Sequence, residues 1–379
     1  MNSMARQSTR PRRSRPRPPG PLTDRTAATS PVQSAMPDET FIELGLDQLA
    51  QRLGSRTRAL AARRWLFDAT PVPTVLPERI PGVNAESWAR LCEAAPLPEW
   101  RLASWHAAAD GTRKFALSFS GAIVETVMIP GPGRSTVCVS SQAGCTRHCA
   151  FCATATLGFT RSLSAGEILL QYLVARASAL PHSPPRNVVF MGMGEPMDNL
   201  DAVLAAVNRL TDEGAPRLSA GNVTVSTSGV VPGMQRFLRE CAAHLALSLN
   251  ATTDAQRARL MPHNKTWPIK TLLDTLRADH ARGSRRRYFI EYVLWAGVND
   301  TDDDAGRLVA LLDGLPAHVN LILHNTFAHS HLRPPTAARV REFQRLVHEA
   351  GVRCLVRAPR GTDIAAACGQ LALSEAAGR

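Results

Sequence analysis

The sequence predicts an α/β fold in which parallel strands alternate with helices, and two observations support this prediction. Short β-rich runs alternate with helical runs from residue 136 to residue 357, a pattern typical of a doubly wound sheet or of a full or partial (β/α) barrel. The first helical run also opens with a capping box, Ser164-x-x-Glu167, ahead of an apolar stretch. The expected strands are 136–141, 187–191, 222–228, 244–250, 287–295, 318–324 and 352–357. The expected helices are near 164–180, 199–213, 233–241, 254–260, 268–281, 302–314 and 335–350.

Residues 1–40 form a basic, low-complexity tail that we expect to be disordered. They contain seven Arg and seven Pro but only three acidic residues, and such a segment cannot bury enough apolar surface to offset chain entropy. Three interpretations stay open: an RNA-contacting arm, an organelle transit peptide, or sequence translated upstream of the true start, for which Met36 is a credible initiator. The proline content disfavours the amphipathic helix of a transit peptide.

Residues 41–98 are expected to form a small helical accessory domain, because leucines recur at helical spacing and Gly54-Ser55 interrupts the run. Over residues 99–135 the period changes to that of strands. Two alternating runs flank Ser120-Gly121, which predicts a β-hairpin linker. The α/β core then spans 136–372, and a short tail follows at 373–379.

The composition favours a polyanionic partner. The 379-residue chain has a formal charge of +12 and a pI near 10.1, which indicates nucleic acid first and an anionic membrane second. A basic surface that only keeps the protein in solution is the alternative. No apolar run approaches the ~18 residues that span a bilayer, and the N-terminus lacks the apolar core of a signal peptide. We therefore expect a cytoplasmic protein with no membrane contact.

The most informative stretch runs from Cys145 to Cys152, where three cysteines are separated by three and then two residues. Three thiolates cannot complete the four-ligand shell of a structural zinc. They can hold three irons of a 4Fe-4S cluster and leave the fourth iron open to a small molecule. A cysteine stripe on a core helix is the alternative, since positions i, i+4 and i+7 share a face, but Thr-Arg-His in the gap is a poor core sequence. His148 is expected to pack beside the cluster or to lie at the surface.

Polar residues recur at the ends of four expected strands. The run from Gly192 to Pro196 follows strand 187–191 and combines glycines, which allow close backbone approach, with Glu195, which could receive an ammonium group. The other three strand ends carry Ser226, Ser248, Asn250 and Asn325. Each is typical of an ordinary loop when taken alone. Because parallel strands present their carboxyl ends at one edge, together they predict one site for a polar ligand.

Two isolated cysteines have open interpretations. Cys138 falls within an expected strand and is either a small buried hydrophobe or a functional thiol. Cys368 lies among small residues and precedes Gly369, so it is either structural or a nucleophile or carrier. The remaining isolated cysteines, Cys92, Cys241 and Cys354, are expected to be structural.

Five motifs taken together resemble one family. Cys145-x3-Cys149-x2-Cys152, with Phe151 before the last cysteine, is similar to the radical S-adenosylmethionine (radical SAM) signature. The other four are Gly192-Met193-Gly194-Glu195-Pro196, Ser226-Thr227-Ser228-Gly229-Val230-Val231-Pro232, Leu260-Met261-Pro262-x-Asn264-Lys265 and Ala367-Cys368-Gly369-Gln370-Leu371. The chain thereby resembles the RlmN/Cfr family of RNA adenine methyltransferases, collinearly from about residue 41 to residue 372. This resemblance implies a partial (β/α)6-type radical SAM barrel.

The resemblance implies two cofactors. A 4Fe-4S cluster would be bound by Cys145, Cys149 and Cys152. The open iron would be chelated by the amino and carboxylate groups of S-adenosyl-L-methionine, two molecules of which are used per turnover. The residues lining S-adenosylmethionine would be Gly194, Glu195, Ser226, Ser248, Asn250 and Asn325.

The resemblance also implies a reaction. Cys368 would receive a methyl group, a 5′-deoxyadenosyl radical would take hydrogen from that methyl, and the carbon radical would add to adenine to give a covalent protein–RNA adduct. Cys138 would resolve the adduct as a disulfide, and Glu125 would be the proton acceptor. The expected product is methylated at C2 of an adenosine in 23S rRNA. A tRNA as second substrate, C8 methylation and a non-RNA substrate stay as alternatives. A flavodoxin or ferredoxin would donate electrons to a monomeric enzyme.

One position departs from the family pattern. The family usually has Ser-Leu-His where this chain has Ser248-Leu249-Asn250. Asparagine can donate or accept a hydrogen bond but cannot titrate near neutral pH. A cofactor contact could survive this replacement, whereas a proton-transfer role could not. The replacement and the basic tail together indicate a divergent subgroup.

Overall fold

A ten-stranded mixed sheet, in the order β1-β2-β3-β4-β7-β8-β9-β10-β11-β12, organises the part of the chain that the computed structural model describes, residues 39–326 and 331–372. Every neighbouring pair from β4 to β12 is parallel. These strands are β4 (Arg134–Cys138), β7 (Pro185–Phe190), β8 (Val223–Thr227), β9 (His244–Ser248), β10 (Tyr288–Leu294), β11 (Ala317–Leu323) and β12 (Arg353–Arg357). The expected series of parallel strands is confirmed.

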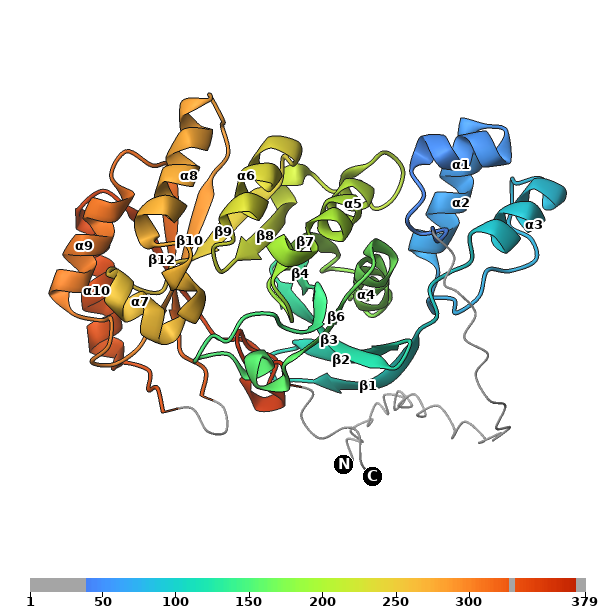
Figure 1. Cartoon of the computed structure of the whole chain (residues 1–379). Helices are drawn as coiled ribbons and strands as arrows, with labels where there is room; N and C mark the ends of the chain where they lie inside the picture. Colours follow the sequence, from blue (N-terminus) through green and yellow to red (C-terminus); the bar gives the residue numbers. More distant parts are fainter. Residues whose placement is uncertain (1–38, 327–330, 373–379) are drawn as a thin grey trace, which may run out of the picture. The chain divides into compact units, whose positions relative to one another are not determined.

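Helices connect the parallel strands and lie in a row beside them (Figure 1). They are α4 (Ala165–Ala177), α5 (Leu200–Thr211), α6 (Val231–Glu240), α7 (Asp254–Leu260), α8 (Ile269–Ala281), α9 (Asp302–Leu312) and α10 (Ala337–Glu349). The expected capping box forms at the start of α4, where Ser164 N donates to Glu167 Oε2 at 2.9 Å and Glu167 N donates to Ser164 Oγ at 3.2 Å. Since the described strands follow a linear order rather than a closed one, the predicted partial (β/α) barrel is confirmed as the fold class.

The segment before the sheet contains three helices, α1 (Leu46–Leu53), α2 (Arg56–Asp68) and α3 (Ala85–Ala94). Gly54 ends α1 in the left-handed conformation, with φ of +71°, as the predicted break requires. Trp88 on α3 is fully buried and meets Phe41 and Trp65 edge to face. Arg176 Nε on α4 donates to Phe67 O at 2.7 Å, which ties α2 to the core.

The compact unit that contains all the described residues spans 37–379. The finer division at residues 41, 99 and 136 stays a prediction. The tail expected to be disordered, residues 1–40, lies outside the described residues except for its last two, and the tail 373–379 lies outside them as well. No helix within the described ranges is long and apolar enough to cross a membrane.

The predicted hairpin is confirmed as β2 (Arg113–Phe119) and β3 (Ala122–Gly131), joined by Ser120 and Gly121 at positive φ. The sequence did not predict a third antiparallel strand, β1 (Arg101–Ala107), which pairs with β2 at the sheet edge. Six of its seven residues are exposed, so it lacks the apolar alternation that identifies a strand. On its other side the hairpin joins the parallel strands, because β3 pairs antiparallel with β4.

The cysteine-rich loop leaves the sheet through a small second ladder of β5 (Gln142–Gly144) and β6 (Phe159–Ser162). Gly144 sits at φ of +73°, and a Cβ there would lie 1.9 Å from the carbonyl oxygen of Gly158. Cys145 N donates to that same oxygen at 2.9 Å. The loop therefore closes at its base through a contact that only glycine allows.

Candidate active site

A cavity opens at the carboxyl ends of the parallel strands, where the sequence predicted a single site. Its walls include ten of the twelve residues singled out from the sequence: Cys145, Cys149, Cys152, Gly194, Glu195, Ser226, Ser248, Asn250, Asn325 and Cys368. The other two, Cys138 and Glu125, are buried behind it in β4 and β3. Residues far apart in the sequence thus share one chamber.

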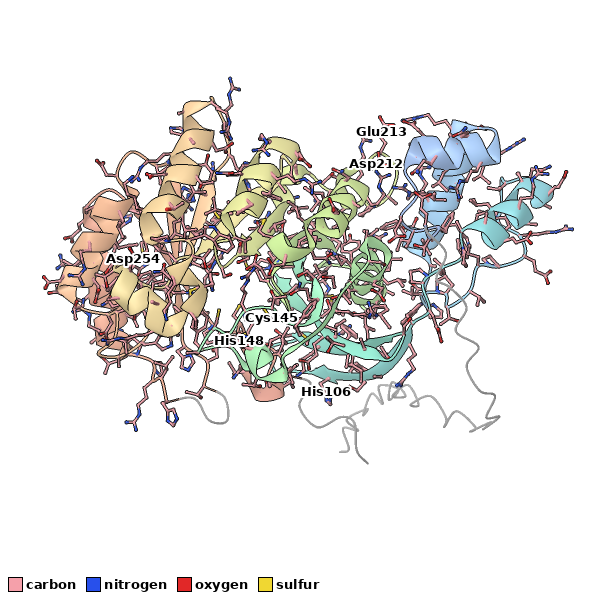
Figure 2. The ribbon with its side chains drawn as sticks, viewed as in Figure 1. His106, Cys145, His148, Asp212, Glu213 and Asp254 are labelled. Atoms are coloured by element: carbon pink, nitrogen blue, oxygen red, sulfur yellow. The ribbon has the colours of Figure 1, made fainter. Side chains whose placement is uncertain are left out.

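The three clustered cysteines reach the cavity from a loop that is fastened to its surroundings. Ala150 N donates to Leu260 O at 2.9 Å, and Ala153 N donates to Gly369 O at 2.7 Å. Arg147 forms an ion pair with Asp198. Cys145 and the exposed His148 both lie on this loop (Figure 2). The loop is therefore held beside both the strand ends and the segment that carries Cys368.

The three clustered cysteine thiols line one cavity, and this donor set fits three irons of an iron–sulfur cluster. Among residues 39–326 and 331–372, no three His, Cys, Asp or Glu side chains are arranged to hold one metal ion. Cubane ligands each bind a different iron, so they line a wall without converging on one point. Burial raises the pKa of the Cys145 thiol to about 12 and raises that of Cys149 as well. Metal binding overcomes such a penalty, because a coordinated thiol is deprotonated.

Glu195 is held rigidly at the end of β7. Its carboxylate accepts hydrogen bonds from Ser228 N at 2.8 Å, Ser228 Oγ at 2.7 Å and Met197 N at 3.1 Å. Burial raises the pKa of this carboxyl, and the hydrogen bonds oppose that rise. A buried acceptor with fixed orientation suits a cationic ammonium ligand, as the sequence predicted for this position.

Arg257 supports the strand ends beside the cavity and was not predicted from the sequence. It is fully buried on α7 and donates to Leu249 O at 2.9 Å, Ser248 O at 3.0 Å and Asn264 Oδ1 at 2.9 Å, and also to Ser228 O. These bonds join the ends of β8 and β9. Desolvation lowers the pKa of its guanidinium to about 10, so the group keeps its charge at neutral pH. Its position just before the Leu260–Lys265 motif was the available signal.

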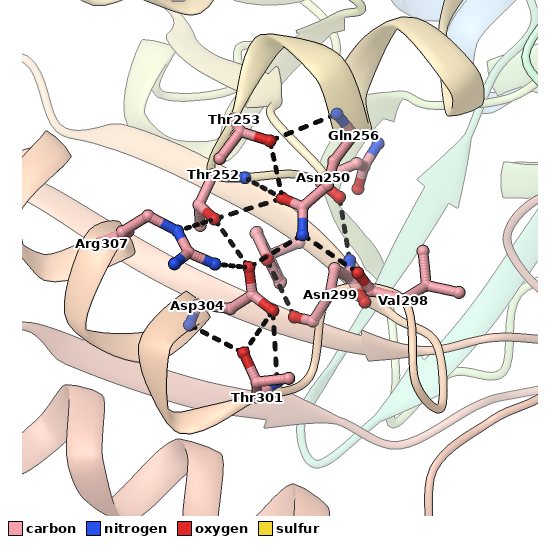
Figure 3. A network of polar contacts seen from close by, with 10 residues as sticks. Asn250, Thr252, Thr253, Gln256, Val298, Asn299, Thr301, Asp304 and Arg307 are labelled. Atoms are coloured by element: carbon pink, nitrogen blue, oxygen red, sulfur yellow. Dashed lines mark hydrogen bonds and ion pairs between the residues drawn. The ribbon is translucent and has the colours of Figure 1, made fainter.

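Asn250, which stands where the family usually has His, acts as a structural link between two strand ends. It adopts a left-handed backbone conformation, with φ of +61°. Its Oδ1 accepts from Val293 N at 2.9 Å, and its carbonyl accepts from Asn299 Nδ2 at 2.9 Å. Figure 3 shows the polar network that continues from it to Asp304. The side chain is thus committed to backbone support beside the cavity.

The network beyond Asn250 is centred on the buried carboxylate of Asp304. Thr252 Oγ1 donates to it at 2.8 Å and Gln256 Nε2 at 3.1 Å, while Arg307 forms an ion pair with it at 2.6 Å (Figure 3). Thr301 and Asp304 also form the capping box of α9. The loops after β9 and β10 are therefore cross-linked by side chains rather than by strand pairing.

Cys368 lies on a C-terminal segment that closes one side of the cavity. The Cys368 side chain is exposed to the cavity. Because protein surrounds the cavity, desolvation raises the pKa of the thiol to about 11. Its carbonyl accepts from Asn325 Nδ2 at 3.1 Å. Asn325, predicted to line the cofactor, therefore also fixes the Cys368 backbone.

Cys138 is buried in β4, and burial raises the pKa of its thiol strongly, with a smaller contribution from Cys368. All eight cysteines fall within the described residues, and all are free thiols. The expected disulfide between Cys138 and Cys368 is therefore not supported. Cys138 is buried within β4, whereas the Cys368 side chain is open to the cavity.

Glu291 lines the cavity and was also missed from the sequence. It lies on β10 opposite Asn320 of β11, whose Nδ2 donates to Glu291 Oε1 at 2.7 Å. Burial raises the pKa of this carboxyl to about 7. The sequence signal was a single acidic residue inside the otherwise apolar strand Tyr288–Leu294.

Comparison with known proteins agrees with this architecture. Residues 139–309 match the model of the radical SAM superfamily. A probable RNA methyltransferase of Sorangium cellulosum is 41% identical over 93% of this chain and 91% of its own. An Anaeromyxobacter protein described as the dual-specificity RNA methyltransferase RlmN is 42% identical over 86% of this chain and 88% of its own. The crystal structure of a radical SAM methyltransferase from Sphaerobacter thermophilus is 37% identical, with a TM-score of 0.78, and covers 88% of this chain and 99% of that chain.

Proposed function

The chain belongs to the RlmN-like RNA methyltransferases of the radical SAM superfamily, and on this premise we propose that it methylates a ring carbon of an adenine in RNA. The observation that carries the proposal is the cavity itself, whose wall combines the three clustered cysteines with Cys368. A radical SAM protein acting on a small molecule or a peptide has no need of that additional thiol. The net charge of +12 also suits a phosphate-rich substrate.

Two cofactors fit the chamber. Cys145, Cys149 and Cys152 are the residues that would hold a 4Fe-4S cluster. S-adenosylmethionine would lie against the strand ends, with Glu195 receiving its ammonium group and Gly194, Ser226, Ser248, Asn250 and Asn325 as neighbours. When bound, these cofactors supply the methyl group and the radical chemistry that an unreactive aromatic carbon requires. The chain's own contribution is to bind them in a cavity at the strand ends and to limit their contact with water.

Three side chains would act on the substrate. Cys368 is the methyl carrier, since its thiol is open to the cavity and its backbone is fixed by Asn325. Glu125, buried in β3, takes the proton that the ring carbon must lose. Cys138, buried in the adjacent strand, would release the product during turnover. Its sulfur would bond to the Cys368 sulfur as the bond from that sulfur to the product carbon breaks, and the carbon would keep the electron pair and take up a proton. The target adenine must leave its stack to reach these groups.

The finer substrate is C2 of an adenosine in 23S rRNA, with methylation at C8 and a tRNA substrate as alternatives. The relative named as a dual-specificity RNA methyltransferase supports an RNA substrate. A flavodoxin or ferredoxin is proposed as electron donor. Nucleoside mass spectrometry of rRNA and tRNA from a deletion strain distinguishes these products, since 2-methyladenosine and 8-methyladenosine separate chromatographically.

Trapping of the covalent intermediate tests the proposal. Under anaerobic, reducing conditions with RNA and S-adenosylmethionine, Cys138→Ala should accumulate protein-bound RNA, because the residue that releases the product is gone. Cys368→Ala should accumulate none, because no carbon is attached to the protein. Cys354→Ala is the matched control, since Cys354 is likewise a buried free thiol but lies on β12 and not on the strand next to β3. Absence of bound RNA in the Cys138→Ala protein would rule the mechanism out.

A further inference from the structure

The segment that carries Cys368, residues 361–371, rests on the β1–β3 hairpin region through several polar contacts. Gly361 N donates to Asp110 Oδ2 at 3.1 Å, and Ala109 N donates to Asp363 Oδ2 at 3.0 Å. The approach is close enough that a Cβ on Gly361 would lie 2.8 Å from Thr112 Cγ2. We call residues 361–371 the carrier segment. Its place is thus set by residues about 250 positions earlier in the chain.

Lys114 on β2 provides one further contact, and it differs from the others because it also reaches Glu125. Its Nζ donates to Ala365 O at 3.2 Å, three residues before Cys368, and lies 2.8 Å from Glu125 Oε1. Both side chains are almost fully buried, with 5% and 4% of their surface exposed. One ammonium group therefore joins a strand of the hairpin to the carrier segment.

We propose that Lys114 is the positioning residue that holds the Glu125 carboxylate and the carrier segment in a fixed relation. The inference rests on the proposed function, in which Glu125 accepts the ring proton while the ring carbon is attached to the carbon on Cys368. In that step the proton moves to a Glu125 carboxyl oxygen, and the electron pair of the C–H bond stays on the ring. The Lys114 ammonium, 2.8 Å from Glu125 Oε1, holds that carboxyl in place until then.

A purely structural role would not explain why this buried ion pair also reaches the carrier segment. A buried ion pair contributes little net stability compared with apolar residues of the same shape, so stability alone does not account for it. Lysine carries three donor hydrogens, and here they connect a carboxylate on β3 with a carbonyl of the carrier segment. A general base must lie within hydrogen-bond reach of its proton. By contacting both Glu125 and Ala365, Lys114 would hold the base at a fixed distance from the segment that carries Cys368.

The test uses the full chain loaded with its cluster and compares Lys114→Met, Lys114→Arg and Glu125→Gln. The two half-reactions are measured separately: methylation of Cys368 by protein mass spectrometry, and release of product from bound RNA. We expect Lys114→Met to slow release by at least ~10-fold, since general base catalysis contributes on the order of 10²–10⁴, and to leave Cys368 methylation within about threefold. Lys114→Arg should restore part of the rate. In the Glu125→Gln background, Lys114→Met should cause no further loss.

A second measurement does not depend on catalysis. Hydrogen–deuterium exchange should become faster in residues 361–371 of Lys114→Met than in the unmodified protein. Lys270→Met is the matched control, because Lys270 forms a surface ion pair with Asp274 and its exchange effect should stay local. If the Cys138→Ala protein accumulates no adduct, the proposed function fails, and exchange alone decides whether Lys114 fixes the carrier segment. Unchanged exchange, or an equal loss of both half-reactions with a lowered melting temperature, would overturn the inference.

Discussion

The buried carboxyl of Glu291 makes the stability of this protein depend on pH in a specific direction. Its pKa is raised from 4.5 to about 7 by desolvation, with only partial relief from the Asn320 hydrogen bond. Below pH 4.5 the carboxyl is neutral in both the folded and the unfolded chain, so its ionisation does not change the free energy of unfolding. Between pH 4.5 and 7 the Glu291 carboxyl is ionised in the unfolded chain but still mostly protonated in the folded protein. The free energy of unfolding therefore falls as pH rises through this range. Above pH 7 the penalty is complete.

The size of this loss in unfolding free energy follows from the difference between the ordinary and the raised pKa of Glu291. A pKa shift of this size corresponds to about 3 kcal/mol, which is a large part of a typical folding free energy. Replacing the residue by glutamine removes the titration but keeps an oxygen that accepts from Asn320. Relative to wild type, Glu291→Gln should therefore gain about 3 kcal/mol in stability between pH 5 and pH 8. For a chain of this size that is roughly 4 °C in melting temperature.

The assay is thermal unfolding of both proteins, without cofactors, at several pH values from 5 to 8. The difference between the two melting temperatures isolates Glu291, because all other titrating groups are common to both proteins. Glu93→Gln, which removes an exposed carboxyl, is the matched control. A difference between wild type and Glu291→Gln that stays constant within about 1 °C over this range would refute the reasoning.

Two further predictions concern backbone positions beside the cavity. Gly144→Ala should retain little iron after reconstitution, because its Cβ would lie 1.9 Å from the Gly158 carbonyl oxygen. Gly158→Ala is the control and should retain most of the iron, since Gly158 has a similar φ but open space around its Cβ. Equal iron contents in the two variants would contradict the steric argument. Asn250→Ala should lose about 2–4 kcal/mol of unfolding free energy, from the unpaired Val293 N and the positive φ. Asn250→Gly should lose up to about 1 kcal/mol less unfolding free energy than Asn250→Ala, since glycine tolerates that φ. If chemical denaturation shows Asn250→Gly to be the less stable of the two variants, backbone strain is unimportant at this position.

The sequence determined the fold class because its signals are local. Strand and helix periods are readable within a few residues, so the parallel strands and their helices were expected in the observed order. The capping box at Ser164 is likewise a contact between residues three apart. The cysteine spacing identified the radical SAM chemistry for the same reason. β1 was missed because an exposed edge strand has no apolar period to read.

Tertiary structure alone decided which distant side chains share the chamber. Strand register places Glu291 beside Asn320, and a buried helix brings Arg257 to three backbone carbonyls of neighbouring strand ends. Lys114 meets Ala365 across about 250 residues. The physical reason is that these contacts depend on strand pairing and on packing of elements far apart in the chain, and no local period records either. The sequence alone identifies the chemistry, whereas the packing of distant elements determines how its residues are held.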